Sequence, residues 1–270
     1  MIFHYFKIAF RNLCKHKTQN IISIIGLAVG LLCFCVCIYC SRFVENTDHC
    51  FANHDRIAEL NLYDGKADRY FSGSPVPLAE DLRTWALGET EAISSVTYPR
   101  ERPYYVELSP EKTLPYELET IEIDTCYNRI FTPEMVAGHW KMASQSLNSV
   151  ILSQSMAIKI FGNAESAIGK HMTLMRRLNT SPESTPKTGG IVYTIQAVMK
   201  DIPLNNSLDF MQNIDMLTVN DSEGLLQSPK RHNMTGANTY VLLSPQTTCT
   251  DLEKQFSKRD YTYTLYGEAY

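Results

Sequence analysis

Hydrophobic positions are concentrated near the N-terminus, where residues 21–40 form a run of twenty residues without a charge. Eleven of them are Ile, Leu, Val or Phe, and a helix of this length covers about 30 Å, the thickness of a bilayer's hydrocarbon core. A cleaved signal peptide is the alternative, but its apolar region is about 7–15 residues long and ends in small residues. We predict an uncleaved transmembrane helix over residues 19–43, continuing as a helix to about residue 50 because no proline interrupts it.

A shorter amphipathic pattern precedes this run. Phe3, Phe6 and Phe10 recur at helical spacing, while Lys7 and Arg11 fall elsewhere around the helix. The pattern is typical of a helix that lies on an anionic inner leaflet and contacts membrane lipid, and an ordinary charged flank is the alternative. Basic residues but no acidic residue precede the span, so residues 1–18 are predicted to be cytoplasmic and the bulk of the chain to lie across the membrane.

Two glycines lie in the middle of the apolar run, although each weakens a helix by roughly 1 kcal/mol relative to alanine. Gly26 and Gly30 are four residues apart, so they share one helix face, and Ser23 extends that face by about one turn. Close packing joins helices in lipid, and small residues permit it. We expect Ser23, Gly26 and Gly30 to face a partner helix, with tolerated glycines as the alternative.

Beyond the span, strand-like alternation and short helical patterns are mixed without a regular βαβ order, which predicts an α+β domain, and we expect two lobes. Strands are predicted near 57–63, 93–98, 103–108, 118–124, 148–153, 171–175, 190–199 and 238–243, and helices over 75–86, 154–161 and 248–258. Residues 176–190 are rich in Ser, Thr, Pro and Gly, and this composition predicts a long flexible hairpin or insertion.

Charge and cysteine content narrow the choice of partners. The chain has 25 Lys and Arg against 29 Asp and Glu. Because four of the basic residues and none of the acidic ones precede the span, residues 41–270 carry a formal charge of −8, which argues against a nucleic-acid partner. Cys50, Cys126 and Cys249 follow the span, and three separated cysteines form no disulfide framework, although one pair could bond.

Neither a catalytic nor a cofactor motif emerges. The stretch "GNAESAIGKH" has six residues between Gly162 and Gly169 where a phosphate-binding loop needs four, so we interpret it as a helix-ending glycine and a turn into a strand. In "DHCFANHD", His49 and His54 are five residues apart without a second ligand pair, which favours a solvated helix over a metal site. We predict no catalytic, cofactor-binding or metal site and no enzyme.

The opening "YFKIAFRNLCKHKTQNIISIIGLAVGLL", followed by "FANHDRIAEL", resembles the start of permease subunits of the MacB/FtsX-like ABC transporter family. The segments "FTPEMVAGHW", "VILSQSMAIKIFGNAESAIGKHMTL" and "YTIQAVMKDIPLNNSLDF" look like that family's periplasmic core domain. The resemblance covers most of residues 1–258. Taken by themselves, these segments are structural: Ser153 caps a helix whose Ala157, Ile158 and Phe161 pack inward.

The resemblance implies a protein of the bacterial inner membrane with a MacB-like periplasmic core domain over residues 44–270. It implies a subunit of an ATP-driven exporter whose domain transmits motion or contacts a periplasmic protein. Its partners would be a separate cytoplasmic ABC ATPase subunit and either further permease helices or a second permease copy. Since the family's three later transmembrane helices have no counterpart in this sequence, we expect a truncated permease. A single-span sensor or adaptor that binds a ligand or protein is the alternative, and a membrane-anchored enzyme comes third.

Overall fold

The computed structural model describes residues 4–5, 11, 15, 17–64, 68–71, 73–109, 112–174, 190–208, 213–221, 224–226, 235–258, 264–265 and 268–269. Contacts between residues divide the chain into two compact units, Met1–Thr47 and Asp48–Tyr270. Each unit is described by itself, and the second is called the sheet domain below.

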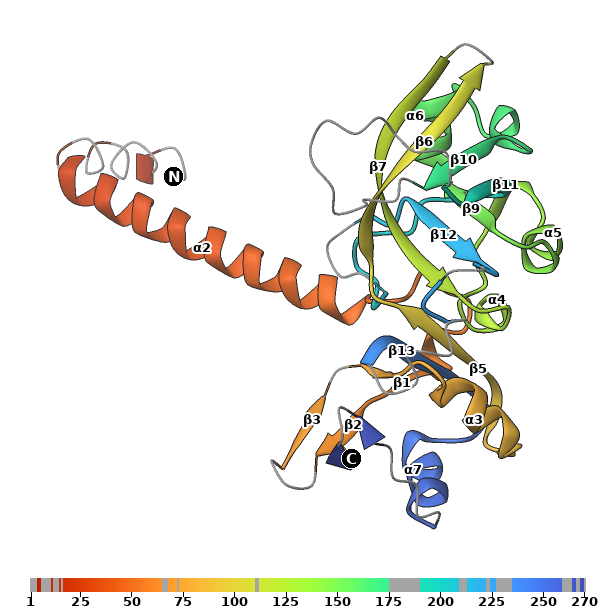
Figure 1. The fold of residues 1–270 in the computed structure, drawn as a ribbon. Coiled ribbons are helices and arrows are strands. Elements are labelled where there is room, and N and C mark those ends of the chain that lie inside the picture. Colours follow the sequence, from red (N-terminus) through yellow and green to blue (C-terminus); the bar gives the residue numbers. More distant parts are fainter. Residues whose placement is uncertain are drawn as a thin grey trace. The chain divides into compact units, whose positions relative to one another are not determined.

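The first unit is dominated by one long helix, α2 (Lys17–Glu45), which has no buried residue (Figure 1). It is long and apolar enough to cross a membrane, as expected of residues 19–43. The expected extension to residue 50 is wrong, because the helix ends at Glu45. At that end Asn46 N donates to Arg42 O, four residues back, at 3.1 Å, whereas Thr47 N donates to Val44 O, only three residues back, at 3.1 Å. The last turn is therefore tighter than the rest of the helix.

The sheet domain contains a large mixed sheet, which confirms the predicted α+β class (Figure 1). Its strands are β1 (Ile57–Leu60), β4 (Ser74–Pro75), β5 (Thr90–Thr97), β6 (Arg100–Ser109), β7 (Lys112–Ile123), β8 (Met135–Gly138), β9 (Ser149–Ser153), β10 (His171–Leu174), β11 (Val192–Met199), β12 (Met216–Val219) and β13 (Thr235–Leu243). Two small hairpins lie outside it, β2 (Leu62–Asp64) with β3 (Arg69–Phe71), and β14 (Thr264–Leu265) with β15 (Glu268–Ala269).

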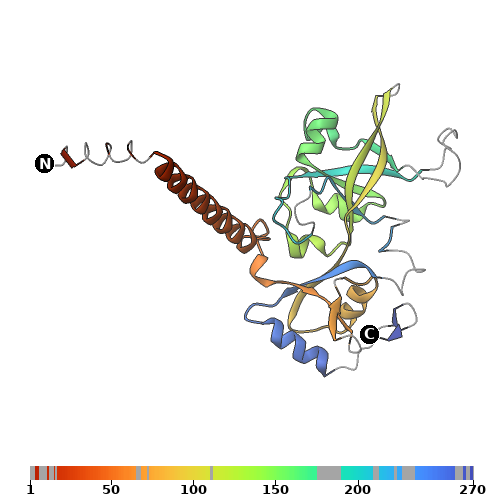
Figure 2. The same cartoon turned by 90° about the vertical axis from the view of Figure 1, so that its left-hand side faces the viewer.

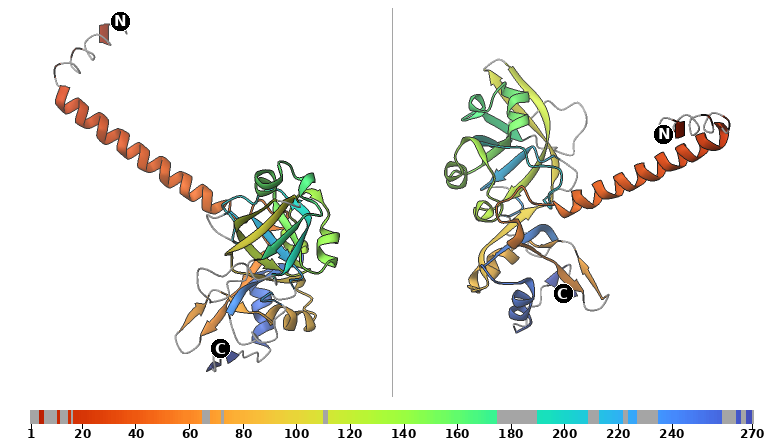
Figure 3. Two further views of the ribbon diagram at one scale, coloured as in Figure 1. Left: turned by 45° about the horizontal axis from the view of Figure 1, so that its top comes forward. Right: turned by 180° about the vertical axis from the view of Figure 1, so that it is seen from behind.

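Six of these strands close into a ring. Neighbours pair in the order β7, β12, β9, β11, β10 and β6, and β6 pairs back onto β7; Figure 3 shows the strands curling into this small barrel. Tyr104, Leu118, Met172 and Tyr193 are fully buried in its core. The same core includes residues of α6 (Gln154–Phe161), the helix that follows β9. Closure removes the open edges that a sheet otherwise exposes.

The remaining strands form an open extension of the barrel, in which β5, β13 and β1 pair in that order and β4 pairs with β13. Helices α3 (Leu78–Thr84) and α7 (Cys249–Ser257) lie against it (Figure 2) and enclose a second core that includes Leu82, Val241 and Leu252. A third core lies under α4 (Tyr127–Phe131) and α5 (Trp140–Gln145) and contains residues from both parts of the sheet. Contacts between residues group Asp48–Tyr270 into one compact unit, so the expected division into two lobes stays a prediction.

Local signals placed several helix ends correctly. Ser153 caps α6, since its hydroxyl accepts a hydrogen bond from Met156 N at 3.4 Å, and Gly162 ends the helix with a positive φ of 86°, a conformation that glycine adopts without strain. The expectation for Ile158 is wrong: its side chain is 50 % exposed. Met156, Ala157 and Ile160 form the buried face of α6, and Ile158 lies on the opposite side of the helix.

Other elements escaped prediction. The strands β8 and β12 are four residues each, and α4 and α5 have five and six residues, too short for helical or strand periodicity to stand out. β10 and β11 pair as antiparallel neighbours, with Thr173 opposite Val192. Residues 175–189, which include most of the predicted flexible hairpin, lie outside the described residues.

Thr132 of the sheet domain adopts a backbone geometry that a β-branched side chain disfavours. Thr132 ends α4 with φ 41° and ψ 55° and is exposed, and left-handed backbone costs a β-branched residue roughly 1–2 kcal/mol. We expect Thr132→Gly to raise the free energy of unfolding by about 1 kcal/mol, measured by urea denaturation. The control is Thr113→Gly at an exposed position of β7, which should lower the free energy of unfolding. Equal losses of stability in both variants would contradict the strain at Thr132.

Candidate functional site

The chain enters the sheet domain through residues 48–56, called the entry segment here. Asp48 begins it and is held at two points: its amide donates to Asn205 O at 3.0 Å, and its Oδ1 accepts from Ser207 N at 2.7 Å. Its positive φ of 64° is one that aspartate tolerates better than most residues. Asp48 is therefore fixed to the loop 200–208, which follows β11.

The middle of the entry segment is anchored to α4. Phe51 is 3 % exposed and meets the ring of Phe131 edge to face, with centroids 5.0 Å apart, and Phe131 meets Tyr240 of β13 in the same way at 5.0 Å. Such ring pairs add about 0.5–1.5 kcal/mol to the burial energy. Asn53 Nδ2 donates to Arg129 O at 3.2 Å and Ile130 O at 3.3 Å, so it satisfies carbonyls at the end of α4.

The last residue of the entry segment is bonded to the open part of the sheet. Arg56 donates to Leu243 O, at 2.9 Å, at the end of β13, and pairs with Glu91 of β5 at 3.0 Å. The entry segment thus contacts the open sheet through Arg56, α4 through Phe51 and Asn53, and the loop after barrel strand β11 through Asp48.

The loop that holds Asp48 is itself well fixed. Asn206 is fully buried; its Nδ2 donates to Pro203 O at 2.6 Å and its Oδ1 accepts from Leu208 N at 3.0 Å. Ser207 O accepts from the hydroxyl of Tyr240 at 3.3 Å. Residues 201–208 of the segment "DIPLNNSLDF", singled out in the sequence, therefore form the loop that binds the entry segment.

Negative groups gather around this anchor. Burial, and secondly the charge of Asp48, raise the pKa of the Glu59 carboxyl above its ordinary value of 4.5. Partial desolvation and then Asp48 raise the pKa of the Cys50 thiol to about 11. Burial and then Glu59 raise the pKa of the Tyr240 phenol. Burial is the largest cause of all three shifts, and it favours the protonated forms of Glu59, Cys50 and Tyr240.

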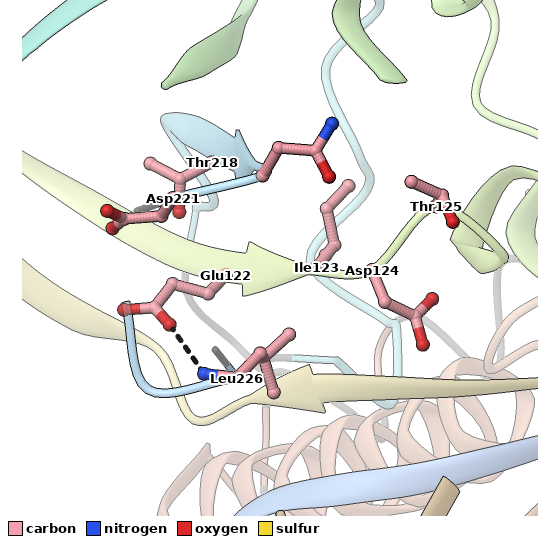
Figure 4. Close-up of a pocket in the computed structure, with 8 residues that line it drawn as sticks. Glu122, Ile123, Asp124, Thr125, Thr218, Asp221 and Leu226 are labelled. Atoms are coloured by element: carbon pink, nitrogen blue, oxygen red, sulfur yellow. Dashed lines mark hydrogen bonds between the residues drawn. The ribbon is translucent and has the colours of Figure 1, made fainter. Parts of the chain in front are cut away.

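A cavity of about 170 Å³ lies at the junction of barrel and open sheet, lined by Glu122, Ile123, Asp124, Thr125, Thr218, Asn220, Asp221 and Leu226. Its three carboxylates point in different directions (Figure 4), and each is bonded within the protein. Glu122 is 3 % exposed, pairs with Arg102 at 2.9 Å, and accepts from the amides of Leu225 and Leu226.

The other two carboxylates of this cavity also accept hydrogen bonds from the protein. Asp124 accepts from Arg83, from Ser94 Oγ at 2.7 Å and from Cys126 N at 2.9 Å. Asp221 accepts from the hydroxyl of Tyr193 at 2.9 Å. These groups hold strands and loops together rather than converge on a common point, so the cavity has the chemistry of a structural junction.

The structure places the predicted site residues as follows. Ser23, Gly26 and Gly30 lie on α2, and a Cβ added to either glycine would meet no atom within 4 Å. Arg11 is helical and exposed, whereas Phe3, Phe6, Lys7 and Phe10 lie outside the described residues. Whether these residues pack against a partner or a membrane stays a prediction.

The rejected motifs have structural roles. Gly162 caps α6, and Gly169 N donates to Ile195 O at 2.8 Å in the turn before β10. The rings of His49 and His54 pack together with centroids 4.2 Å apart. Within the described ranges no group of three His, Cys, Asp or Glu is placed to hold a metal ion, and Cys50, Cys126 and Cys249 are free thiols. Sequence reasoning missed the entry segment, since its contacts with α4, β5, β13 and the loop 200–208 join residues far apart in the chain, such as Asn53 and Arg129, which are 76 positions apart.

The described chain combines a helix of membrane-spanning length with an α+β domain made of a closed barrel and an open sheet. No family model and no curated protein matches the sequence. Among solved structures, a domain of a Porphyromonas gingivalis protein proposed to be a permease is similar, with 23% identity, a TM-score of 0.55, and coverage of 78% of this chain and 87% of that one.

Two further similarities concern named transporters. The periplasmic region of MacB from Actinobacillus actinomycetemcomitans shares 13% identity over 80% of this chain and 86% of its own, with a TM-score of 0.49. The extracellular domain of the ABC-type transporter YknZ from Gram-positive bacteria shares 12% over 73% and 87%, with a TM-score of 0.44. The fold assignment depends on the first comparison, which shows that the sheet domain shares the fold of a domain from a protein proposed to be a permease.

The Arg102–Glu122 pair provides a test of the junction. Glu122→Gln leaves Arg102, whose side chain is 22 % exposed, without its charge partner, so we expect a loss of about 2–4 kcal/mol in the free energy of unfolding by urea denaturation. The control is Glu134→Gln, which breaks the pair with Lys200 whose side chains are 71 % and 62 % exposed and should cost under about 0.5 kcal/mol. Similar losses from both pairs would refute the structural role of Glu122.

The Cys50 thiol gives a second test. With a pKa of about 11, Cys50 is almost entirely protonated at pH 8, and only the thiolate reacts. In a variant whose other cysteines are serine, the rate of iodoacetamide labelling should rise about tenfold per pH unit between pH 8 and 10. Asp48→Asn removes a neighbouring negative charge, lowers the pKa and speeds labelling at pH 9. If the labelling rate of the protein that retains Asp48 levels off below pH 9, the pKa of Cys50 is not raised as the structure indicates.

Proposed function

We propose that the protein is a permease subunit of an ATP-driven exporter, held in the bacterial inner membrane by α2 with its N-terminus in the cytoplasm. In this proposal residues 1–18 lie on the cytoplasmic face, residues 19–43 span the bilayer and residues 44–270 form the periplasmic core domain. The fold shared with a permease domain and the family resemblance of the sequence support it. A cytoplasmic ABC ATPase subunit would supply the energy.

The observation that carries the proposal is the anchoring of the entry segment. Only Asn46 and Thr47 separate the last residue of α2 from Asp48, and Asp48, Phe51 and Arg56 are bonded to separate parts of the sheet domain. Two residues of chain provide little slack, since an extended residue spans at most about 3.6 Å. Movement of the helix end would therefore reach a folded domain rather than be lost in a linker, as transmission of motion requires.

The second part of the proposal concerns a partner for α2. Its residues at positions 23, 26, 30, 33, 37 and 40 are Ser, Gly, Gly, Cys, Cys and Cys, a small-residue series with alternating steps of three and four. Steps of this kind keep one helix face toward a partner, as in coiled coils. We infer that this face meets another permease helix or a second copy of the chain, because the helix has no buried residue of its own.

Natural cysteines make the proposed face testable. At 100° per residue, Cys37 lies close to the direction of Gly26 and Gly30, while Cys35 lies on the opposite side of α2. Full-length chains with Cys37 or Cys35 as the sole cysteine should differ in membranes: a short bis-maleimide should crosslink Cys37 and leave Cys35 monomeric. Mass spectrometry of the product identifies a second copy or another membrane protein.

The glycines are then tested in the Cys37 background. Gly26→Leu with Gly30→Leu should leave insertion unchanged, because leucine is favourable at a helix centre, and should abolish the crosslink by filling the face. Equal crosslinking of Cys35 and Cys37, or an unchanged product in the double variant, would count against a partner-facing stripe.

Recovery of an ATPase is the test of the transport assignment itself. The full chain, purified from its native membranes in mild detergent, should carry a nucleotide-hydrolysing subunit with it, and Asp48→Asn should alter transport-coupled hydrolysis without releasing that subunit. Copurification of soluble periplasmic proteins without an ATPase would instead favour the single-span sensor or adaptor.

A further inference from the structure

Two exposed tyrosine rings lie side by side on the small hairpin of β2 and β3. Tyr63 and Tyr70 are directly opposite in the antiparallel register, so both side chains leave the same face of the hairpin. The ring centroids are 5.1 Å apart and the rings are inclined by 49°. The two residues are 46 % and 74 % exposed. A single exposed aromatic residue is ordinary, but a pair in contact on one face is a candidate binding surface.

This ring pair is held in place. The Tyr63 hydroxyl donates to Asp68 Oδ1 at 2.8 Å, and its ring is in contact with that of Tyr70. The hairpin is also fixed at its base, because β1 before it and β4 after it both pair with β13; Figure 1 shows the hairpin projecting from this part of the sheet. A ligand that binds the rings therefore loses little affinity to ordering of the side chains.

The tyrosine face has a negative charge beside it. Asp68 contacts the Tyr63 hydroxyl. Asp64 and Arg69 are opposite each other in the register, and strand alternation directs both to the other face of the hairpin. The domain around the hairpin is acidic as well, since residues 41–270 carry a formal charge of −8. Its field attracts cations and repels anions.

The spacing of the rings allows one cation to meet both. A cation is attracted to the face of an aromatic ring within about 6 Å of its centroid. Because the two centroids are 5.1 Å apart, a cation about 5 Å above their midpoint lies about 5.6 Å from each. The exposed area of the two rings is roughly 250 Å², whereas each partner in a stable protein interface contributes about 800 Å². The surface therefore suits a small ligand rather than a second copy or a folded protein.

We propose that Tyr63, Tyr70 and Asp68 bind a small quaternary ammonium compound, with the cation over the rings and Asp68 as the opposite charge. A quaternary ammonium group has no N–H that needs an acceptor, and Asp68 Oδ1 already accepts from Tyr63. The ammonium of a lysine is strongly hydrated and would lose hydrogen bonds to water without replacement. The site belongs to the hairpin of the sheet domain, so it depends neither on the partner proposed for α2 nor on an ATPase.

Choline and its neutral analogue, in which carbon replaces the ammonium nitrogen, test the site because they differ in charge and hardly in shape. With the full-length chain in a maltoside detergent, saturation-transfer NMR should show saturable binding of choline through its N-methyl protons and at least about fivefold weaker binding of the analogue. Tyr70→Leu removes one ring and should weaken choline binding about two- to fivefold. Asp68→Asn retains an acceptor for the Tyr63 hydroxyl and should weaken binding of choline but not of the analogue.

Two further variants serve as controls. Glu117→Gln, at an exposed position of β7, changes the net charge as Asp68→Asn does and should leave choline binding unchanged. Tyr70→Phe keeps the ring and should retain binding, which separates loss of the ring from damage to the hairpin. Absence of choline binding to the wild-type chain, equal binding of the neutral analogue, or equal losses in Glu117→Gln and Asp68→Asn would overturn the proposal. Tighter binding of a lysine amide than of choline would overturn the choice of ligand.

Discussion

The length of β7 makes the sheet domain one body. Its twelve residues pair with β6 along most of their length, its last four pair with β12, and Ile123 at its end pairs with Val96 of β5. A shorter strand would leave the barrel and the open sheet as separate modules joined by loops. Because one strand belongs to both, the third core can form across the join, and side chains such as Phe131 and Tyr240 pack between the two parts. Closure of the barrel also pairs a second edge of this long strand over its last four residues, and that edge would otherwise be exposed and need protection.

The entry segment contacts several parts of this continuous domain. Its bonds are modest one by one, since a neutral hydrogen bond adds about 0.5–1.5 kcal/mol net and a charged one more. They are spread over three separate elements, however, and an aromatic ring lies in the middle of them. Local opening of such a segment requires several contacts to break together, which is the physical meaning of a rigid attachment.

The sequence could predict what depends on neighbours along the chain. The apolar run of α2, the Ser153 cap, the Gly162 stop and the long strands all follow from local periodicity and capping, and they appear near the expected positions. The expectation for Ile158 failed because five of the eight residues of α6 are apolar, so the pattern does not show which side of the helix faces the core. The ring closure and the Asp48 receptor could not be predicted, since they join residues such as Asp48 and Ser207 that are 159 positions apart. Short elements such as β12 form because their partners β7 and β9 provide hydrogen bonds on both sides, a cause that no local window contains.

The carboxylates that line the cavity at the junction of barrel and open sheet hold parts of the domain together. Groups of the domain itself donate hydrogen bonds to the carboxylates of Glu122, Asp124 and Asp221. A general acid or base needs an unshared position facing a substrate, and these side chains point apart (Figure 4). Asp48 differs only in what it binds: its partner is the loop that receives the chain from α2. The same chemistry, a carboxylate accepting backbone amides, therefore closes the barrel junction at Glu122 and fixes the point of attachment at Asp48.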